Sequence, residues 1–255
     1  MTDFDIESFI IKPDELSKPE QILVYSDYGQ GKTTFAASAA KFAPTSPVLY
    51  LDLEGSTTGV TRDVPPENID IIRPKNMPIP KGMSKEEGWI HNTDQILVAF
   101  LTGKMSREYK TIVIDPLNVY NDWCVDHFER KEMSQPNPNN FAIWTEAAKK
   151  TTGSNGIFPL LKDAGVLSIL VVHQKTDDKG VADFAWRGSG SRAKVGQTPD
   201  VVIHLSLDTD RNTGESHTEA QMFASRTIGA KNRFNLPSFV EDLTIEKLWT
   251  LCDNH

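Results

Sequence analysis

Cysteine is scarce in this sequence, and its scarcity excludes several classes of protein. The 255 residues include two cysteines, Cys124 and Cys252, whose separation fits neither a disulfide framework nor a metal site. No apolar run approaches the roughly 20 residues needed to span a membrane. Residues 1–6 lack the basic flank and apolar stretch of a signal peptide. We therefore expect a cytoplasmic protein that makes no contact with membranes.

The sequence also lacks an excess of basic residues. It has 35 acidic and 27 basic side chains, which give a formal net charge of −8. Residues 1–20 carry six acids and two lysines, and residues 241–255 carry four acids and one lysine. We predict an acidic N-terminal extension over 1–20, a candidate oligomerisation segment, then a core over 21–240 and an acidic C-terminal segment over 241–255. Because the core is nearly neutral, with 24 basic and 25 acidic residues, nucleic acid could bind it only through local basic loops.

Short β-branched runs alternate with longer helical stretches, which is typical of a mostly parallel sheet with helices on its faces. Runs such as 112–114 and 169–172 are apolar without alternation, as expected for strands buried on both faces. Strands are predicted at 21–26, 48–52, 111–115, 167–173, 200–207 and 219–226. Helices are predicted at 32–43, 86–103, 117–131 and 140–164, the last interrupted near 153–156. Residues 61–85 are predicted to be an exposed connection, and residues 174–199 a long polar segment that is functional or disordered.

Residues 26–34 form a near-complete phosphate-binding loop. The standard pattern is Gly, four residues, then Gly-Lys-Ser/Thr; the second half is intact here, whereas Ser26 stands at the position of the first glycine. An apolar run precedes the loop and a helix-competent run follows it. In such a loop the backbone N–H groups face an anion, Lys32 reaches the β- and γ-phosphates, and the Thr33 hydroxyl holds Mg²⁺. The alternative is a glycine-rich turn that happens to precede Lys-Thr. The residues predicted to bind a nucleoside triphosphate are Ser26, Asp27, Tyr28, Gly29, Gln30, Gly31, Lys32, Thr33 and Thr34.

Two carboxylates follow predicted strands. Asp115 ends the buried run 111–115, where it would lie beside the pair of Thr33 and Mg²⁺; the alternative is a cap on the helix that starts near Pro116. Glu54 follows the run 48–52, a position from which it could polarise an attacking water as a general base. The alternative for Glu54 is a solvated loop acid.

Two further motifs are less specific on their own. His173 and Gln174 end a third buried strand, with side chains able to hydrogen-bond a γ-phosphate or a water. Lys231 and Arg233 lie two residues apart in a turn after the last core strand, and the plain interpretation of that turn is a solvated basic surface.

In this order along residues 20–237, these pieces resemble the ATPase core of RecA/Rad51-type recombinases. The resemblance is greatest to the short phage-encoded single-strand annealing proteins that amount to a minimal RecA core. The pieces are the phosphate loop, a strand followed by Glu, a strand ending in Asp, a strand ending in His-Gln and the Lys-Asn-Arg turn. The resemblance implies a RecA-like P-loop NTPase fold, an α/β fold with a mostly parallel central sheet and helices on both faces.

The resemblance also implies roles, cofactors and partners. Glu54 takes the place of the catalytic carboxylate, and Gln174, with His173 beside it, that of the side chain that senses the γ-phosphate. Lys231 and Arg233 take the place of cations that reach into the ATP site of a neighbouring subunit. The implied cofactors are ATP and Mg²⁺. The implied partners are single-stranded DNA, further copies of the chain in rings or filaments, and a single-strand-binding protein; a phage-encoded protein would act in the host cytoplasm.

In RecA-like proteins the loop after the sensing strand contacts single strands, and here that loop is residues 175–194. It has five basic and three acidic residues, with two aromatics close to an arginine. Exposed aromatics beside arginines suit base stacking and phosphate contact, whereas the alternative is that the aromatics pack onto the core. The candidate DNA-binding residues are Lys175, Phe184, Trp186, Arg187, Arg192 and Lys194.

Three functions fit these observations. The first is an ATPase that depends on DNA, assembles on single strands and promotes annealing or homologous recombination. The second is a nucleotide or small-molecule kinase, although such kinases carry an Asp-Arg pair after a strand and Asp115 is followed by Pro116. The third is a non-catalytic scaffold whose assembly is regulated by nucleotide. ATP turnover with and without single-stranded DNA distinguishes them.

Overall fold

The computed structural model describes residues 17–209 and 213–254, so most of the predicted N-terminal extension lies outside the described residues. The described chain forms a ten-stranded sheet in the spatial order β10-β8-β7-β1-β5-β4-β2-β3, with β6 paired to β5 and β9 to β7. The strands from β7 to β3 in that order are parallel, and the other four pair antiparallel. The strand bounds are Gln21–Ser26 (β1), Val48–Asp52 (β2), Ile69–Ile72 (β3), Thr111–Asp115 (β4), Leu167–Thr176 (β5), Ala182–Phe184 (β6), Val201–Thr209 (β7), Ser216–Gln221 (β8), Lys231–Asn232 (β9) and Phe239–Glu241 (β10).

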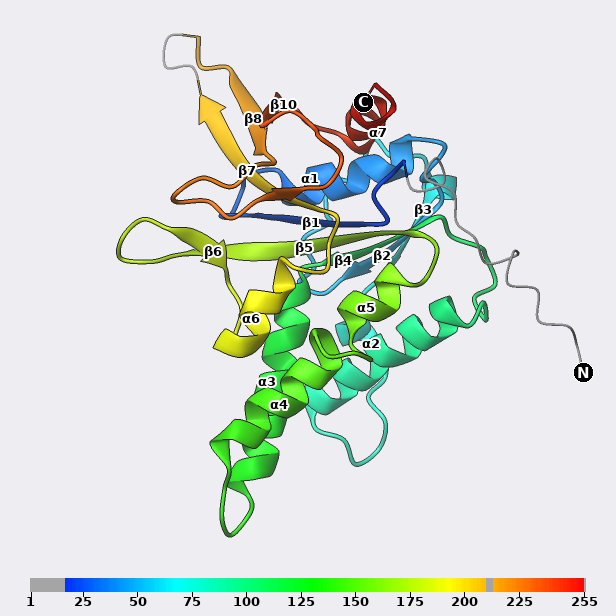
Figure 1. Cartoon of the computed structure of the whole chain (residues 1–255). Helices are drawn as coiled ribbons and strands as arrows, with labels where there is room; N and C mark the ends of the chain where they lie inside the picture. Colours follow the sequence, from blue (N-terminus) through cyan, green and yellow to red (C-terminus); the bar gives the residue numbers. More distant parts are fainter. Residues whose placement is uncertain (1–16, 210–212, 255) are drawn as a thin grey trace, which may run out of the picture.

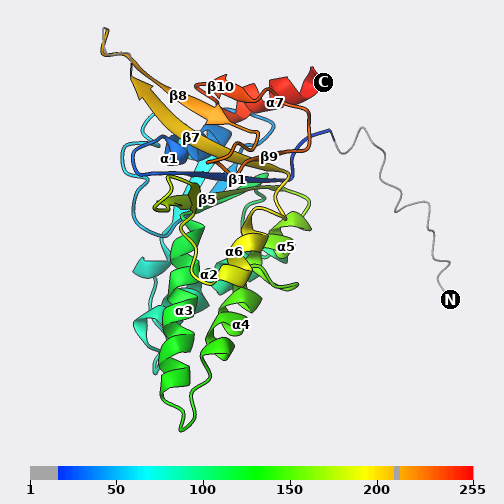
Figure 2. The ribbon, with the colours of Figure 1, turned by 60° about the vertical axis from the view of Figure 1, so that its left-hand side comes forward.

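Helices cover both faces of this sheet (Figures 1 and 2). One face carries α1 and α7, and the other carries α2 to α6. The helix bounds are Lys32–Ala37 (α1), Lys85–Leu101 (α2), Leu117–Met133 (α3), Asn140–Thr151 (α4), Ile157–Lys162 (α5), Ser189–Val195 (α6) and Ile245–Asp253 (α7), with 3-10 turns at Ser38–Lys41, Pro66–Asn68 and Pro74–Asn76. The predicted fold class, α/β with a mostly parallel sheet between helical layers, is confirmed.

The core explains why the central strands do not alternate in polarity. Every residue of β1, β2 and β4 is buried. Successive side chains of β1 enter opposite layers: Ile22 and Val24 pack in the layer of α1 and α7, whereas Leu23 and Tyr25 pack in the layer of α2 and α3. A strand with apolar partners on both sides needs no polar face.

The register of the parallel strands gathers the predicted site residues at one edge. Ser26, the last residue of β1, lies beside His173 of β5, and Asp52 of β2 lies beside Asp115 of β4. Because these strands all point the same way, their carboxyl ends meet at one edge of the sheet. The phosphate loop leaves β1 at that same edge.

Local sequence accounts for several helix boundaries. Ser84 begins α2 with a reciprocal capping box, in which its hydroxyl accepts from the Glu87 N–H and the Glu87 carboxylate accepts from the Ser84 N–H. The predicted break in the helix at 140–164 is confirmed, because α4 ends at Thr151 and α5 starts at Ile157. A Cβ atom at Gly156 would lie 2.3 Å from the Thr151 carbonyl oxygen, so this turn requires glycine.

Several element predictions were wrong in detail. The helix predicted at 32–43 is α-helical only to Ala37 and continues as a 3-10 turn. The strand predicted at 219–226 runs over 216–221, because its antiparallel pairing with β7 sets its bounds. The predicted connection at 61–85 contains the edge strand β3, which is short and has one parallel neighbour. The C-terminal segment contains α7, which buries Ile245 and Leu248 in the core. None of the described helices is long and apolar enough to cross a membrane.

Candidate active site

The phosphate loop connects β1 to α1 through two glycines in the left-handed region. Gly29 and Gly31 have φ angles of 73° and 88°, which glycine adopts without steric penalty. Gly31 is the residue before α1, and a Cβ atom at this position would lie 3.1 Å from Cγ2 of Thr218. The backbone angle therefore favours glycine at position 31, and the close neighbour leaves little room for a side chain.

The Lys32 side chain is buried and folds back onto the phosphate loop. Its Nζ donates to the Ser26 carbonyl at 3.0 Å, to the Ser26 hydroxyl at 3.1 Å and to the Asp27 carbonyl at 2.6 Å. Burial lowers the pKa of the Lys32 ammonium, and the nearby carboxylates of Asp115, Asp27 and Glu54 oppose that shift. A bound phosphate would replace these neutral oxygen acceptors with charged ones.

Asp115 faces the hydroxyl of Thr33, as the metal hypothesis requires. Its Oδ2 accepts from Thr33 Oγ1 at 2.8 Å and from the Tyr50 hydroxyl at 2.5 Å. No side chain caps α3, so the alternative role of Asp115 as a helix cap is not realised. Burial raises the pKa of Asp115, and the two hydrogen bonds oppose the rise. A hydroxyl and a carboxylate that converge on one point form a donor set of the hard oxygens that Mg²⁺ prefers.

Glu54 projects from the loop after β2 toward His173 at the end of the buried part of β5. The two carboxylate oxygens of Glu54 lie 3.2 and 3.1 Å from His173 Nε2. The hydrogen bond from His173 lowers the pKa of Glu54, against the effect of burial. Glu54 is thus an ionised carboxylate at neutral pH, in contact with a second titratable group of the site.

The loop that carries Glu54 is fixed by a carboxylate to which the sequence analysis gave no role. Asp52 is buried and accepts from the backbone N–H groups of Gly55 and Ser56, from the Thr57 hydroxyl and from Arg73 Nε. Burial alone would raise the pKa of Asp52, but these hydrogen bonds lower it. Asp52 therefore holds the turn that presents Glu54. A carboxylate at the end of a fully apolar strand was the signal in the sequence, since a buried charge needs several donors.

The phosphate loop and the side chains of Glu54, Asp115 and His173 line one cavity of about 290 Å³. Its wall includes residues 28–34 of the loop together with Glu54, Ser56, Val60, Asp115 and His173. A second cavity of about 200 Å³ shares the lining residues Gly31, Thr34 and Val60 with the first, so the two cavities adjoin and together make up one cleft. The second cavity extends between α1 and the strands β7 and β8, where Leu205, Thr218 and Leu243 line it. The first cavity is polar and cationic at Lys32, whereas the second is mainly apolar.

Gln174 lies outside this cleft. Adjacent residues of a strand point to opposite sides, so His173 faces Glu54 and Gln174 does not. The Gln174 side chain contacts His204 Nε2 at 2.8 Å and the Thr176 hydroxyl at 2.9 Å. Of the two predicted γ-phosphate contacts, the structure brings only His173 to the cavity.

Lys231 and Arg233 lie at the opposite edge of the sheet. The strand β9 pairs with Val201 and Val202, the first residues of β7, whereas the phosphate loop leaves the other end of the adjacent β1. Lys231 Nζ donates to the carbonyls of residues 197 and 199, and Arg233 forms an ion pair with Asp200 at 3.0 Å. These two cations therefore do not reach the phosphate loop of their own chain.

The segment predicted to bind DNA is folded. Phe184 and Trp186 are only 9% and 6% exposed. Phe184 packs edge-on against Tyr25, and Trp186 packs against Phe158 and donates from Nε1 to the Ser191 hydroxyl at 3.1 Å. The expectation that both rings are exposed for base stacking is wrong, because apolar contacts on the α3–α6 face of the sheet bury them.

The four cations of this segment that were predicted to contact DNA fall into two groups. Arg187 pairs with Asp126 and Glu129 of α3, and Arg192 pairs with Asp183 of β6. By contrast, Lys175 and Lys194 are exposed and form no ion pair with another described residue. Of the predicted phosphate contacts, these two lysines are exposed without a charged partner among the described residues, whereas Arg187 and Arg192 are half-buried and paired.

The match to a protein family agrees with this geometry. A family model described as an AAA domain matches residues 18–234. Because the match covers most of the chain and includes every residue of the cavity, the protein belongs to this family and is a P-loop ATPase domain. No curated protein matches the chain.

Solved structures with a similar arrangement include two secretion ATPases. One is a prototypical ATPase from the type III secretion system of pathogenic bacteria, with 10% identity and a TM-score of 0.43 over 76% of this chain and 51% of that one. Another is the assembled ATPase EscN from the type III secretion system of enteropathogenic E. coli, with 12% identity and a TM-score of 0.47 over 74% of this chain and 43% of that one. The chain thus spans about half the length of these proteins.

Proposed function

We propose that this P-loop ATPase domain hydrolyses ATP through Glu54 and assembles on single-stranded DNA, where it promotes annealing or homologous recombination. The observation that carries the catalytic part is the convergence of four groups on one cavity. Lys32 and Thr33 begin α1, Glu54 follows β2 and Asp115 ends β4, so the four residues come from three separate segments of the chain, and all line the cavity of about 290 Å³. A structural loop would not require a cation, a hydroxyl and two carboxylates at one point.

The chemistry follows from what each side chain can do. Lys32 exchanges its loop carbonyls for the β- and γ-phosphate oxygens, which neutralises charge that develops there. Thr33, with Asp115 behind it, would hold Mg²⁺, which supplies further charge neutralisation when bound. Glu54 accepts a proton from a water whose oxygen attacks the γ-phosphorus, while the bond to the β-phosphate oxygen breaks and ADP leaves. His173 orients Glu54 through the hydrogen bonds at 3.1–3.2 Å.

The second cavity suits the nucleoside end of the ligand. A triphosphate on residues 28–34 would direct its base past Thr34 into the cavity beside Leu205, Thr218 and Leu243. The apolar lining there supports stacking or packing of a flat base.

Two observations support assembly and DNA binding. The order of motifs resembles that of RecA-like proteins, in which the segment after β5 contacts single strands. Lys231 and Arg233 lie far from the loop of their own chain, so any contact that they make with ATP would be in a neighbouring subunit. The kinase alternative lacks such support, because Asp115 is followed by Pro116 and not by arginine.

The test is ATP turnover by the purified chain with and without a 30-nucleotide oligo-dT, together with direct binding of ATP and of the oligonucleotide. We expect turnover that rises with single-stranded DNA and that Lys32→Ala abolishes. Electron microscopy of the protein with ATP and the oligonucleotide should show rings or filaments.

Each contrary outcome identifies a different alternative. ATP turnover that requires a small-molecule phosphate acceptor would identify a kinase. ATP binding without turnover, coupled to assembly, would identify a nucleotide-regulated scaffold. Turnover by a protein that does not bind oligo-dT would retain the ATPase and remove the role in recombination.

A further inference from the structure

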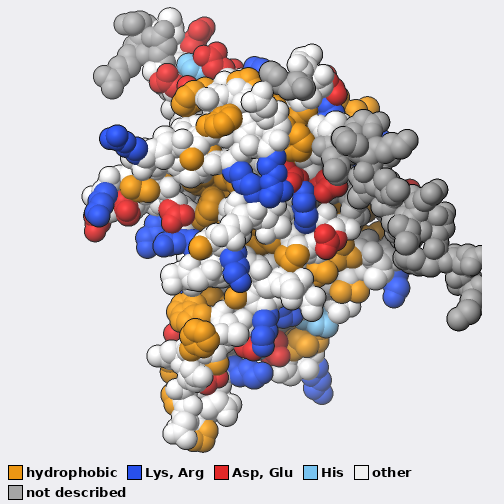
Figure 3. All heavy atoms as spheres, viewed as in Figure 1, with side chains coloured by type: hydrophobic (Ala, Val, Ile, Leu, Met, Phe, Trp, Pro, Cys, Tyr) orange, Lys and Arg blue, Asp and Glu red, His pale blue; other side chains and the backbone are white. Residues whose placement is uncertain are grey.

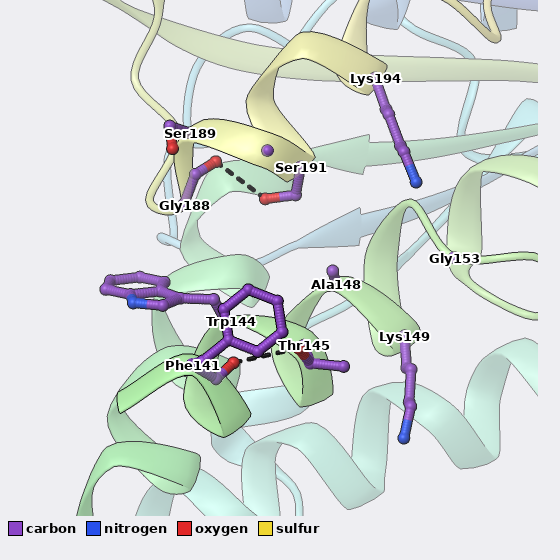
Figure 4. A pocket seen from close by; sticks show the side chains of 11 residues that line it. Phe141, Trp144, Thr145, Ala148, Lys149, Gly153, Gly188, Ser189, Ser191 and Lys194 are labelled. Carbon is purple, nitrogen blue, oxygen red and sulfur yellow. Dashed lines mark hydrogen bonds between the residues drawn. The ribbon is translucent and has the colours of Figure 1, made fainter. Parts of the chain in front are cut away.

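A cavity of about 830 Å³ lies between α4 and α6, apart from the ATPase cleft (Figure 4). Its lower wall in the figure is α4 with the following turn, and its upper wall is α6 with the residues just before it. None of its lining residues lines the ATPase cleft. Its volume is within the range of about 300–1,000 Å³ that ordinarily holds a ligand.

Two aromatic side chains of α4 project from this wall into solvent. Phe141 is 76% exposed and Trp144 is 40% exposed, and both rings lie on the side of α4 that faces α6 (Figure 4). Their spacing of three residues places them on the same side of the helix. In Figure 3, hydrophobic side chains gather on the surface over α4. Exposed apolar side chains that gather in one patch are typical of interaction sites.

The Trp144 ring packs against the turn at Gly188, just before α6. Gly188, whose φ is 95°, approaches it so closely that a Cβ atom would lie 3.3 Å from Trp144 Cε3. Ser191 Oγ donates to the Gly188 carbonyl at 3.0 Å and so closes the turn that meets the ring. Trp144 therefore has one edge of its ring against the turn at Gly188, while part of the side chain remains accessible.

The charged side chains that line the cavity are both cations. Lys194 of α6 points toward α4 across the cavity, whereas the Lys149 side chain leaves α4 on the side away from α6 (Figure 4), and no described carboxylate lines the cavity. Lys194 forms no ion pair with another described residue, whereas Lys149 pairs with Glu146 at 2.6 Å on the same helix. Both side chains of that pair are well exposed, and exposed ion pairs contribute little to stability. A phosphate could therefore replace Glu146 as the partner of Lys149.

We propose that this cavity is a binding site for single-stranded DNA, in which bases stack on Phe141 and Trp144 while Lys149 and Lys194 contact the phosphates. The proposal rests on the proposed function and names the surface that carries it. Exposed aromatic faces beside cations are the features that sequence-tolerant single-strand binding uses. In this proposal Phe141 and Trp144 stack on the bases, in place of Phe184 and Trp186, which are buried.

Charge and shape favour this ligand over the other occupants. A second copy of this chain has a net charge of −8, so it could also be attracted to the two lysines. Contact with a folded copy, however, needs only apolar side chains, and it would give no reason for flat π surfaces here. Duplex DNA hides the faces of its bases, so it cannot stack on Phe141 and Trp144. Single strands supply both accessible base faces and one negative charge per nucleotide.

The test measures binding of a fluorescent 30-nucleotide oligo-dT by anisotropy across a salt series, with the full chain. Phe141→Ala and Trp144→Ala should each weaken binding by about 5- to 150-fold. Lys194→Ala should weaken binding and reduce the magnitude of the slope of log K against log salt by about 0.7. ATP binding and turnover without DNA should stay unchanged in all three variants, because none of these residues lines the ATPase cleft.

Matched variants separate stacking from general effects. Phe141→Trp and Trp144→Phe should retain most of the affinity, whereas Phe141→Leu should not, because leucine is apolar but has no π face. Glu146→Gln should tighten binding slightly, since it releases Lys149. Phe239→Ala removes an aromatic side chain of β10 that is 55% exposed and lies outside this cavity. This variant should bind oligo-dT with the affinity of the parent.

Three outcomes would overturn the proposal. If the parent binds oligo-dT and the variant with both Phe141→Ala and Trp144→Ala binds it equally well, the cavity is not the site, although the proposed function survives. If that double variant binds DNA normally but loses self-association in sedimentation velocity, the surface is a contact between copies. If the parent does not bind oligo-dT at all, this proposal fails together with the DNA part of the proposed function.

Discussion

Ser26 occupies the position of the first glycine of the phosphate loop, and its hydroxyl has a use there. It accepts from the Lys32 ammonium at 3.1 Å and donates to the Asp27 carbonyl at 3.0 Å. Glycine could provide neither hydrogen bond. The substitution thus fits a loop that holds its lysine on its own oxygen atoms when phosphate is not bound.

Replacement of Lys32 tests the central site at the scale of one residue. Lys32→Ala should abolish ATP hydrolysis and sharply weaken triphosphate binding, because Lys32 is the only lysine or arginine among the described residues that line the cavity. Steady-state turnover and titration calorimetry measure the two effects. Lys85→Ala, which removes an exposed lysine at the start of α2, is the control and should leave both unchanged. If Lys32→Ala hydrolysed ATP at the rate of the parent, the assignment of residues 26–34 as a phosphate-binding loop would be wrong.

Glu54 and His173 are a second test at this scale. Glu54→Gln should leave ATP binding largely intact and slow turnover by about 10²–10⁴-fold, the usual consequence of losing a general base. Since the hydrogen bond from His173 lowers the pKa of Glu54, His173→Ala should move the acid limb of the rate–pH profile upward. Glu67→Gln, in a 3-10 turn elsewhere in the chain, is a matched control. Unchanged turnover in Glu54→Gln would make Glu54 a loop acid.

At the scale of elements, the turn after β2 depends on an ion pair with the end of β3. Arg73 follows β3 and donates from Nε to Asp52 at 2.9 Å and from a terminal nitrogen to the Thr57 hydroxyl at 3.2 Å. The short edge strand that sequence patterns missed therefore has a consequence for the site. It positions the arginine that closes the turn carrying Glu54.

Replacement of Asp52 tests this dependence. Asp52→Asn should lower the free energy of unfolding by about 1–3 kcal/mol, because a buried carboxylate with several donors is lost, and should reduce turnover more than ATP affinity. Chemical denaturation and steady-state kinetics measure the two effects.

The same variant gives a dependence on pH with a defined sign. The folded-state pKa of Asp52 is below its unfolded value, so its stabilisation is fully present above the unfolded pKa, about 3.9. It is lost as the pH falls through the folded-state pKa. The stability difference between the parent and Asp52→Asn should therefore shrink below about pH 4. A difference that is constant over this range would show that the carboxylate charge is not what holds the turn.

At the scale of the whole molecule, the predicted site residues lie at two opposite edges of the sheet. The carboxyl edge carries the ATPase cleft, and the amino edge carries Lys231 and Arg233 beside Asp200. In a head-to-tail assembly the amino edge of one subunit can meet the carboxyl edge of the next. Cations supplied in this way would neutralise charge on the γ-phosphate and accelerate hydrolysis by orders of magnitude.

A mixing experiment tests this arrangement. The variant with both Lys231→Ala and Arg233→Ala should bind ATP but hydrolyse it slowly. A mixture of this variant with Glu54→Gln should recover part of the activity, because one partner provides the carboxylate and the other the cations. Lys162→Ala removes another cation that contacts Asp200, so it controls for disruption of that local network and should stay active. No recovery in a mixture that co-assembles would make the turn a structural or solvated surface.

The sequence alone determined the fold class and the chemical core of the site. The phosphate loop, Glu54 and Asp115 follow strands whose apolar runs are recognisable without a structure, and parallel strands necessarily bring their carboxyl ends together. Those predictions depend on local pattern and on one topological rule, and neither needs the positions of distant side chains.

Tertiary structure alone decided which side chains reach the cleft and which are covered. Whether His173 or Gln174 faces Glu54 depends on which face of β5 packs against α3. The burial of Trp186 and the exposure of Trp144 depend on packing between α6, α5 and α4, segments that are far apart in sequence. Two tryptophans have the same intrinsic preference for burial, so only the space left by the surrounding helices determines which of them is buried and which faces solvent.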